Sequence, residues 1–178
     1  MGATESAPWE NLRDARIKMR TGDAEVMTES EIKALANGKV DIGEEVCRAG
    51  HFEMIEKFRT QVDFDFRTLK GETCLHLAVK HGRDEFVSRV ESNENLRPIF
   101  ENQANLTTPK DSDTPLHYLT KYCKDAYSRA KLATTILRLG GNPNTINSEK
   151  YKPHHYLINS RADEAIFLLE SASRKLLG

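Results

Sequence analysis

The fold of this chain is decided by the stretch Thr73-Cys74-Leu75-His76-Leu77-Ala78, because nearly the same letters recur twice downstream. The second copy is Thr114-Pro115-Leu116-His117-Tyr118-Leu119, and a degraded third copy is Lys152-Pro153-His154-His155-Tyr156-Leu157. The second copy begins 41 residues after the first, and the third begins 38 residues after the second. Self-similarity at such a spacing indicates a repeat architecture, in which each unit buries its apolar face against its neighbours.

The first copy predicts a short helix, a turn and a second helix. Thr73 is a residue type that caps a helix, and Gly82 suits the positive φ that often ends one. Phe86 and Val90 then give the second helix an apolar face. The same succession of helix, glycine turn and second helix is expected earlier in the chain, with Gly50 in the place of Gly82. The helix before Gly50 lacks the threonine and the histidine.

These letters resemble the T-P-L-H-x-A pattern of the ankyrin repeat, whose period is about 33 residues. Residues 136–144 also follow the L-L-x-x-G-A-D-V-N pattern that closes an ankyrin repeat. The resemblance covers roughly residues 40–170 and implies an all-α ankyrin-repeat solenoid of about four helix-turn-helix repeats with hairpin loops and an N-terminal helical cap. The repeats are expected at about 40–68, 69–109, 110–147 and 148–172.

Both spacings exceed the ankyrin period, which predicts two insertions. We expect the first around residues 92–102, after the second helix of its repeat. We expect the second around residues 124–128, between the two helices of the third repeat. Insertions usually form loops because the cost of closing a loop grows slowly with its length. Such loops either shape a specific surface or are merely tolerated, and the sequence leaves both alternatives open.

The two ends of the chain have weaker patterns. Residues 1–39 are expected to form a helical capping segment that is partly mobile, and residues 171–178 the C-terminal end. Thr28-Glu29-Ser30-Glu31 matches a capping box, and another helix is expected over residues 9–19. Gly2 fits the M-G-x-x-x-[ST] pattern of N-myristoylation, although one acyl chain holds a membrane only marginally.

Composition limits the classes of function. A net charge of −1 provides no basic field for nucleic acid, and no apolar run approaches the roughly 18 residues of a membrane helix. No secretory signal is recognisable. The cysteines, Cys47, Cys74 and Cys123, lack metal-type spacing, so we expect buried free thiols in a reducing compartment, the cytoplasm and/or the nucleus.

The recurring histidines, His76, His117 and His155, raise the possibility of a metal site. Equivalent residues of packed units lie about 10 Å apart, whereas zinc ligands lie near 2 Å from the ion, so these side chains cannot share a metal. We expect each imidazole instead to bond to a hairpin backbone or to the repeat threonine, Thr73 or Thr114, and so to tie neighbouring repeats together. No cysteine has a near base and orienting group, so we expect neither catalytic residues nor a cofactor.

Ankyrin proteins commonly bind partners through their hairpin tips and the concave face of their inner helices. The resemblance therefore implies a protein partner, and lysines at the tips favour one with acidic segments. The alternative, that these residues form ordinary solvated turns, stays open. The residues expected on this surface are Arg67, Lys70, Lys80, Lys110, Asp111, Lys121, Tyr122, Asn147, Lys150 and Tyr151.

Residues 71–82 resemble the repeats of the inhibitors of NF-kappaB, the IκB group. Short chains with about four such repeats are similar to the IκB-like vankyrin proteins of viruses carried by parasitoid wasps, which hold host NF-kappaB (Rel) transcription factors in an unreleased complex. The sequence contains no D-S-G-x-x-S phosphodegron. The resemblance thus implies a monomeric inhibitor that sequesters a Rel factor, in a host cell if the protein is viral. The alternative is an ankyrin adaptor or effector for an unrelated protein, tethered to a membrane only if Gly2 is acylated.

Overall fold

The computed structural model describes residues 8–21, 31, 42–58, 64–157 and 164–176. These residues form helices and turns, with no strand among them, so the expected all-α class is confirmed at this level. No helix within the described ranges is long and apolar enough to cross a membrane.

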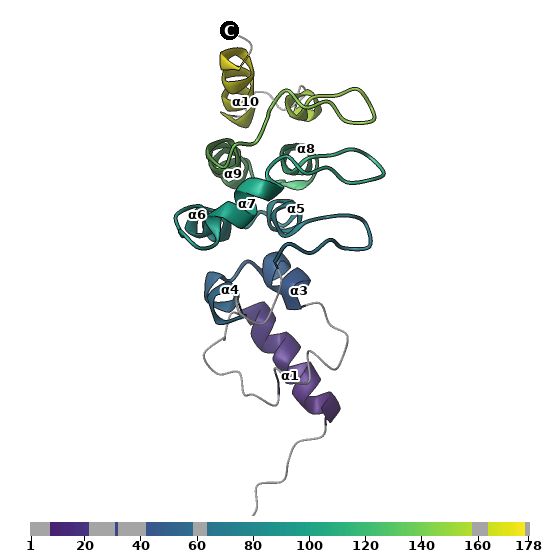
Figure 1. The fold of residues 1–178 in the computed structure, drawn as a ribbon, viewed down its shortest axis with the longest axis vertical. Helices are drawn as coiled ribbons and strands as arrows, with labels where there is room; N and C mark the ends of the chain where they lie inside the picture. The colour runs from purple at the N-terminus through teal and green to yellow at the C-terminus, as the bar shows by residue number, and fades with distance from the viewer. Residues whose placement is uncertain (1–7, 22–30, 32–41, 59–63, 158–163, 177–178) are drawn as a thin grey trace, which may run out of the picture.

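The helices follow one another in pairs along the long axis of the molecule (Figure 1). The inner helices are α3 (Ile42–Ala49), α5 (Cys74–Lys80), α8 (Pro115–Tyr122) and the 3-10 helix η2 (Pro153–Leu157). The outer helices are α4 (Phe52–Phe58), α6 (Asp84–Glu91), α9 (Ala126–Arg138) and α10 (Glu164–Lys175). Inner helices pack on inner helices and outer on outer, in chain order.

The core lies between the inner and outer helices. Leu75 and Leu116, the leucines of the first two copies of the repeated letters, are both fully buried. Burying a leucine side chain contributes about 1.5–3 kcal/mol relative to leaving it in water. The largest fully buried side chains are Phe86, Phe100, Met54, Ile55, Leu75, Leu77, Leu116, Leu119 and Leu132.

The repeated threonine and histidine form the contacts between neighbouring helix pairs. The Thr73 hydroxyl donates to His76 Nδ1 at 2.9 Å, and His76 Nε2 donates to the Asp113 carbonyl of the next pair at 3.1 Å. His117 repeats the arrangement with Thr114 at 2.9 Å and the Tyr151 carbonyl at 3.0 Å. A carbonyl can only accept, so each ring carries a hydrogen on Nε2. Each Nδ1 in turn accepts from the backbone N–H of its threonine, at 3.3 Å for Thr73 and 3.2 Å for Thr114, so both rings are neutral. We expected each imidazole to bond either to the repeat threonine or to a hairpin backbone. In the structure, His76 and His117 each make the two kinds of bond.

The third copy keeps half of this arrangement. Lys152 replaces the threonine, and its backbone N–H donates to His155 Nδ1 at 3.2 Å. The helix that follows Lys152 is η2, a single short 3-10 segment rather than an α-helix of the length of α8.

The first insertion is a helix, not the loop that we expected. α7 (Arg97–Gln103) fills residues 97–103 and packs against α5 and α6. Phe100 is fully buried, with its ring 6.1 Å from that of Phe86. The buried Gln103 side chain accepts from the Leu75 backbone N–H at 3.0 Å and donates to the Phe64 carbonyl at 2.8 Å. The insertion is therefore part of the core, because its amide satisfies buried backbone groups of two earlier segments.

The second insertion was expected between α8 and α9, and that position is wrong. The two helices are separated by residues 123–125, just as α5 and α6 are separated by residues 81–83. The extra residues lengthen the outer helix instead, since α9 has 13 residues and α6 has eight. Asp125 caps the longer helix by accepting from the Ser128 N–H at 2.7 Å.

The expectation of free thiols is wrong for two of the three cysteines. Cys47 of α3 and Cys74 of α5 are joined in a disulfide, with their Cα atoms 5.2 Å apart. Both positions are fully buried where these adjacent inner helices pack. Cys123 is a buried free thiol, as expected. The count and spacing of cysteines could not reveal a pairing that depends on how α3 and α5 pack.

At the N-terminal end, α1 (Pro8–Thr21) includes the helix expected over residues 9–19 and packs on α3. Ala15 is fully buried, and Lys18 forms an ion pair with Glu31 at 2.7 Å. The remainder of the expected capping box at 28–31, the helix after it and Gly2 lie outside the described residues.

Breaking the Cys47–Cys74 disulfide should lower the free energy of unfolding of the oxidised protein by about 3–4 kcal/mol, because the bond closes a loop between residues 27 apart. Denaturant unfolding with and without reductant measures the loss. Cys47→Ser is the control, since reductant should leave its midpoint unchanged. If all three thiols can be alkylated in protein that has been unfolded without any reductant, the disulfide is absent.

Acid should weaken the imidazole contacts. Burial lowers the pKa of His76 from 6.5 to about 4, and burial also lowers that of His117. The unfolded chain binds protons to these imidazoles more readily than the folded chain does. The stabilising contribution of the neutral rings is therefore fully present above pH 6.5 and is lost as the pH falls toward 4. His76 alone should cost about 1 kcal/mol between pH 7.5 and 5.5. Urea unfolding at both pH values tests this: His76→Gln should have a shallower pH dependence, and an equal slope in both proteins would contradict it.

Candidate protein-binding surface

The chain turns back in hairpins on the side of the inner helices, and these project side by side (Figure 1). The first hairpin is closed by a backbone bond from Thr68 N to the Glu72 carbonyl at 2.9 Å, and the second by one from Thr108 N to the Asp113 carbonyl at 3.0 Å. The third is closed by a bond from Asn147 N to the Tyr151 carbonyl at 3.1 Å. The hairpins therefore place residues about 40 positions apart in the chain on one surface.

Direct contacts hold each hairpin against the next. Arg67 donates to the Thr107 carbonyl of the second hairpin at 3.0 Å, and Ser148 N of the third donates to the Asp111 carbonyl of the second at 2.9 Å. Gly71 has φ +75° and lies so close to the second hairpin that a Cβ there would come within 2.2 Å of Pro109 Cδ. These contacts fix the tips relative to one another.

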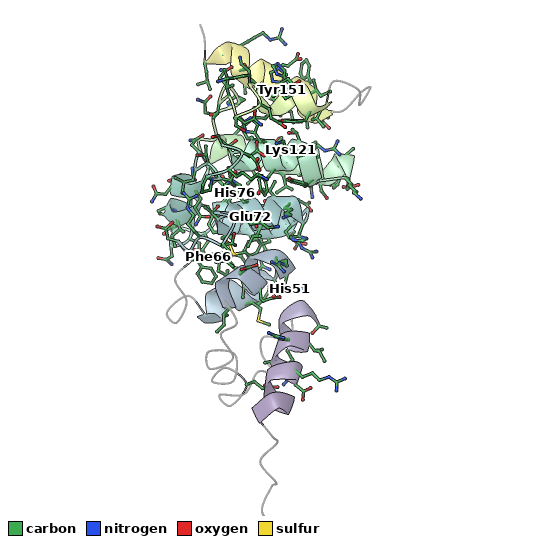
Figure 2. The ribbon with its side chains drawn as sticks, turned by 90° about the vertical axis from the view of Figure 1, so that its right-hand side faces the viewer. His51, Phe66, Glu72, His76, Lys121 and Tyr151 are labelled. Carbon is green, nitrogen blue, oxygen red and sulfur yellow. A yellow bond between two sulfur atoms is a disulfide. The ribbon has the colours of Figure 1, made fainter. Side chains whose placement is uncertain are left out.

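Lys80 and Lys121 were expected on the partner-binding concave face, and in the structure each is bound to a carboxylate of its own hairpin. Lys80 pairs with Glu72 at 2.8 Å, and Lys121 with Asp113 at 2.6 Å. Figure 2 shows Glu72 and His76 in one layer of the stack and Lys121 in the next. Burial alone would lower the pKa of Lys121, but its hydrogen bonds to Asp113 and Tyr156 outweigh burial and raise it. Only 15% of the Lys121 side chain is exposed, so most of it is in contact with the protein itself. Its ion pair with Asp113 is therefore mainly structural.

Asn147 was expected at a tip and is instead buried. Its Nδ2 donates to Asp113 Oδ1 at 2.7 Å and to the Tyr156 hydroxyl at 2.6 Å. Its Oδ1 accepts from the backbone N–H groups of Glu149 and Tyr151, each at 3.1 Å. The side chain therefore shapes the third hairpin from within, because every polar atom of the amide has a partner.

The tip lysines differ from the inner ones. Lys70, Lys110 and Lys150 are exposed, and none of them has an ion pair with another described residue. Tyr122 and Tyr151 are also exposed, at 44% and 49%. The Tyr122 ring lies 5.0 Å from that of Tyr118, in an edge-on contact. Free cations and exposed aromatic rings thus occupy the same side of the molecule.

A hollow of about 420 Å³ lies between the first two hairpins and the inner helices. It contains five of the residues expected from the sequence, Lys70, Lys80, Lys110, Asp111 and Tyr122. The others, Arg67, Lys121, Asn147, Lys150 and Tyr151, lie outside its lining. The lining also contains Leu69, which lies within the expected first tip, and four residues that were not expected on this surface: Glu72, Thr108, Pro109 and Tyr118. The exposed leucine at the tip was a readable signal, because it interrupts an otherwise polar turn.

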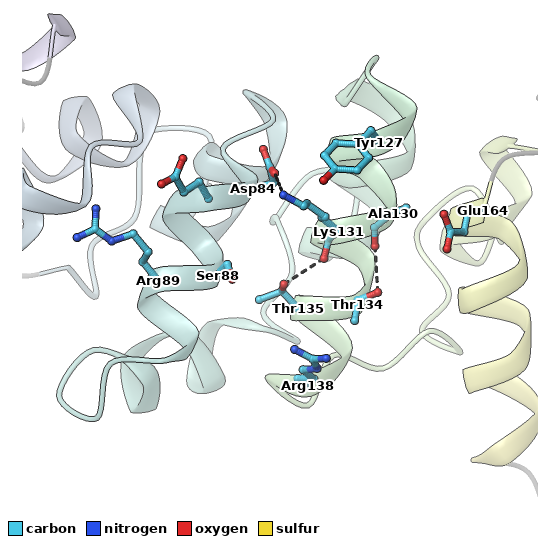
Figure 3. Close-up of a pocket in the computed structure, with 11 residues that line it drawn as sticks. Asp84, Ser88, Arg89, Tyr127, Ala130, Lys131, Thr134, Thr135, Arg138 and Glu164 are labelled. Atoms are coloured by element: carbon cyan, nitrogen blue, oxygen red, sulfur yellow. Dashed lines mark hydrogen bonds and ion pairs between the residues drawn. The ribbon is translucent and has the colours of Figure 1, made fainter.

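A second hollow, of about 560 Å³, lies on the outer side between α6, α9 and Glu164 of α10 (Figure 3). Two of its ionic groups pair with each other, Asp84 with Lys131 at 3.4 Å, and a third, Arg89, pairs with Glu53 outside the lining. The Thr134 and Thr135 hydroxyls donate to carbonyls of their own helix. Among the described residues, no group of three His, Cys, Asp or Glu side chains is placed to hold a metal ion.

The Lys121–Asp113 pair gives a direct test of which lysines are structural. Lys121→Met should lower the free energy of unfolding by about 3 kcal/mol, because it leaves the Asp113 carboxylate, 1% exposed, without its cation. Lys110→Met at the exposed tip should change it by about 0.5 kcal/mol or less. Urea unfolding of both variants decides; equal effects would show that the inner pair contributes nothing beyond a surface charge.

Comparison with known proteins agrees with the helix-pair geometry. No protein-family model matches the chain. A curated relative, the ankyrin repeat-containing protein YGL242C of Saccharomyces cerevisiae, is 28% identical over 103 residues, which cover 57% of this chain. The chain thus spans about half of the yeast protein, 54% of its length. Ankyrin repeats are typically non-enzymatic modules that bind other proteins. The chain is thus distantly similar, over part of its length, to an ankyrin repeat-containing protein, and its described residues form successive helix pairs.

Proposed function

We propose that this chain is a non-enzymatic ankyrin-repeat solenoid of about four repeats whose hairpin tips and neighbouring inner helices bind a protein partner. The observation that carries the proposal is the hollow between the first two hairpins, with exposed lysines at its rim and a tyrosine on its wall. Tyrosine is enriched at the energetic centres of protein interfaces, because its ring supplies a large contact area and its hydroxyl a hydrogen bond. The bracing of the hairpins favours binding, since little motion must be lost when a partner docks.

For the partner, we propose a Rel-homology transcription factor. The chain would then act as an IκB-like inhibitor that sequesters NF-kappaB in the cytoplasm or nucleus and lacks the phosphodegron for its release. The support is the resemblance of residues 71–82 to IκB repeats. The same residues supply the turn at Gly71 and all of α5, next to the hollow. An adaptor for an unrelated protein would use the same surface with a different partner.

The test is titration of the purified chain with a recombinant Rel-homology dimer by calorimetry, followed by competition with labelled DNA. We expect a stoichiometric complex and reduced DNA binding. Tyr122→Ala should weaken the complex about 30-fold, because truncating a central interface tyrosine costs about 2 kcal/mol. Tyr127→Ala is the matched control, since Tyr127 is an exposed tyrosine of the outer hollow.

No complex at micromolar concentration would contradict the Rel assignment. A complex that Tyr127→Ala weakens as much as Tyr122→Ala would instead show that the partner does not use the hairpin surface. Stable binding of a different protein, lost in Tyr122→Ala, would favour the adaptor function.

A further inference from the structure

We propose that the hollow between the first two hairpins receives a short extended segment of the partner in which two acidic residues flank an apolar one. The apolar side chain enters the hollow, and the two carboxylates face Lys70 and Lys110. This inference rests on the proposed protein-binding function and adds the chemistry of the segment that is recognised.

The walls of the hollow suit an apolar side chain. Leu69 at the first tip is fully exposed, and Pro109 lies at the second. Tyr118 and Tyr122 of α8 line the inner wall with their rings in edge-on contact. Isolated exposed apolar residues are common on proteins, but here the exposed Leu69, Pro109 and Tyr122 border a single concavity, which is the usual arrangement at the centre of an interface. An inserted aromatic or long aliphatic side chain would remove their exposed area from water.

The charges around the hollow favour a negative segment. Glu72 is already neutralised by Lys80, whose ammonium group also lies 5.5 Å from the centre of the Tyr122 ring. Among the charged residues of the lining, Lys70 and Lys110 have no ion pair with another described residue. Asp111 is a carboxylate of the lining that also has no ion pair with a described residue. Arg67 of the first hairpin, outside the lining, adds a positive charge, because its bonds to the Gly71 and Thr107 carbonyls leave the guanidinium charge uncompensated. The balance of these groups is positive.

The separation of the tips sets the spacing in the partner. The two lysines sit on consecutive hairpins, and the helix pairs that carry them pack at a distance of about 8–10 Å. A polyproline II segment advances about 9 Å in three residues and returns its side chains to the same side. Acidic residues three positions apart can therefore face Lys70 and Lys110 together, while an apolar residue between them points toward the tyrosines.

The experiment is an NMR titration of the isotope-labelled full chain with peptides in which glycines flank the probe sequence. The probes are Glu-Ala-Phe-Glu, the charge-reversed Lys-Ala-Phe-Lys, and Glu-Ala-Ala-Glu without the apolar side chain. We expect Glu-Ala-Phe-Glu to bind most tightly and to shift the amide signals of Leu69, Lys70, Lys110 and Tyr122. Reversing both charges by Lys70→Glu with Lys110→Glu should weaken binding about tenfold, since each exposed ion pair contributes modestly and repulsion replaces it. Increasing salt should weaken the binding of the acidic peptide as well.

The matched control is Lys124→Glu with Lys175→Glu, which reverses two exposed lysines away from the hollow. Equal affinity for the acidic and basic peptides, signal shifts elsewhere on the protein, or equal weakening by both double variants would overturn the inference. A protein complex that forms with unchanged affinity in Lys70→Glu/Lys110→Glu would overturn the acidic segment and leave protein binding intact. Binding of the acidic peptide without any Rel complex would instead contradict only the Rel partner.

Discussion

The stack of helix pairs depends on neutral imidazoles that are hydrogen-bonded on both sides. Each ring accepts within its own helix cap and donates to a carbonyl of the next hairpin, so a single side chain sets both the start of a helix and the position of its neighbour. His76 reaches Asp113, whose carboxylate in turn binds Lys121 and Asn147. Asp113 therefore joins three successive units, and together with the direct contacts between hairpins it positions the candidate surface.

The helix starts and the contacts between units could be predicted from the sequence because they are local and repeated. Thr73 and His76 lie one helical turn apart, and the same pair recurs at Thr114 and His117. The role of the inner lysines was not predicted, although a signal was present. Lys80 follows Glu72 by eight residues, and Lys121 follows Asp113 by the same interval. A recurring acid and base at a fixed interval favours an internal ion pair over a free cation.

The features that were mispredicted depend on contacts between segments distant in the chain. The spacing located the first insertion correctly, but helix α7 owes its order to burial of Phe100 against Phe86. Pro98 in its first turn could have indicated a helix start. The disulfide likewise depends on the packing of α3 on α5, and neither cysteine carries a local sign of it. Of the candidate surface, the tip residues follow from turn chemistry, whereas the hollow exists only once two hairpins lie side by side.

Gln103 has a consequence for the order in which the molecule opens. Repeat proteins can unravel unit by unit from their ends, since each unit contacts only its neighbours. The Gln103 amide, however, reaches back to Leu75 and Phe64, 28 and 39 positions earlier. Loosening the stretch around α7 would leave buried backbone groups of two earlier segments unpaired, at a cost of about 1–3 kcal/mol for each. The middle of the chain should thus open as one cooperative block, and the buried backbone amides of α5 and α7 should be among the last to exchange their hydrogens.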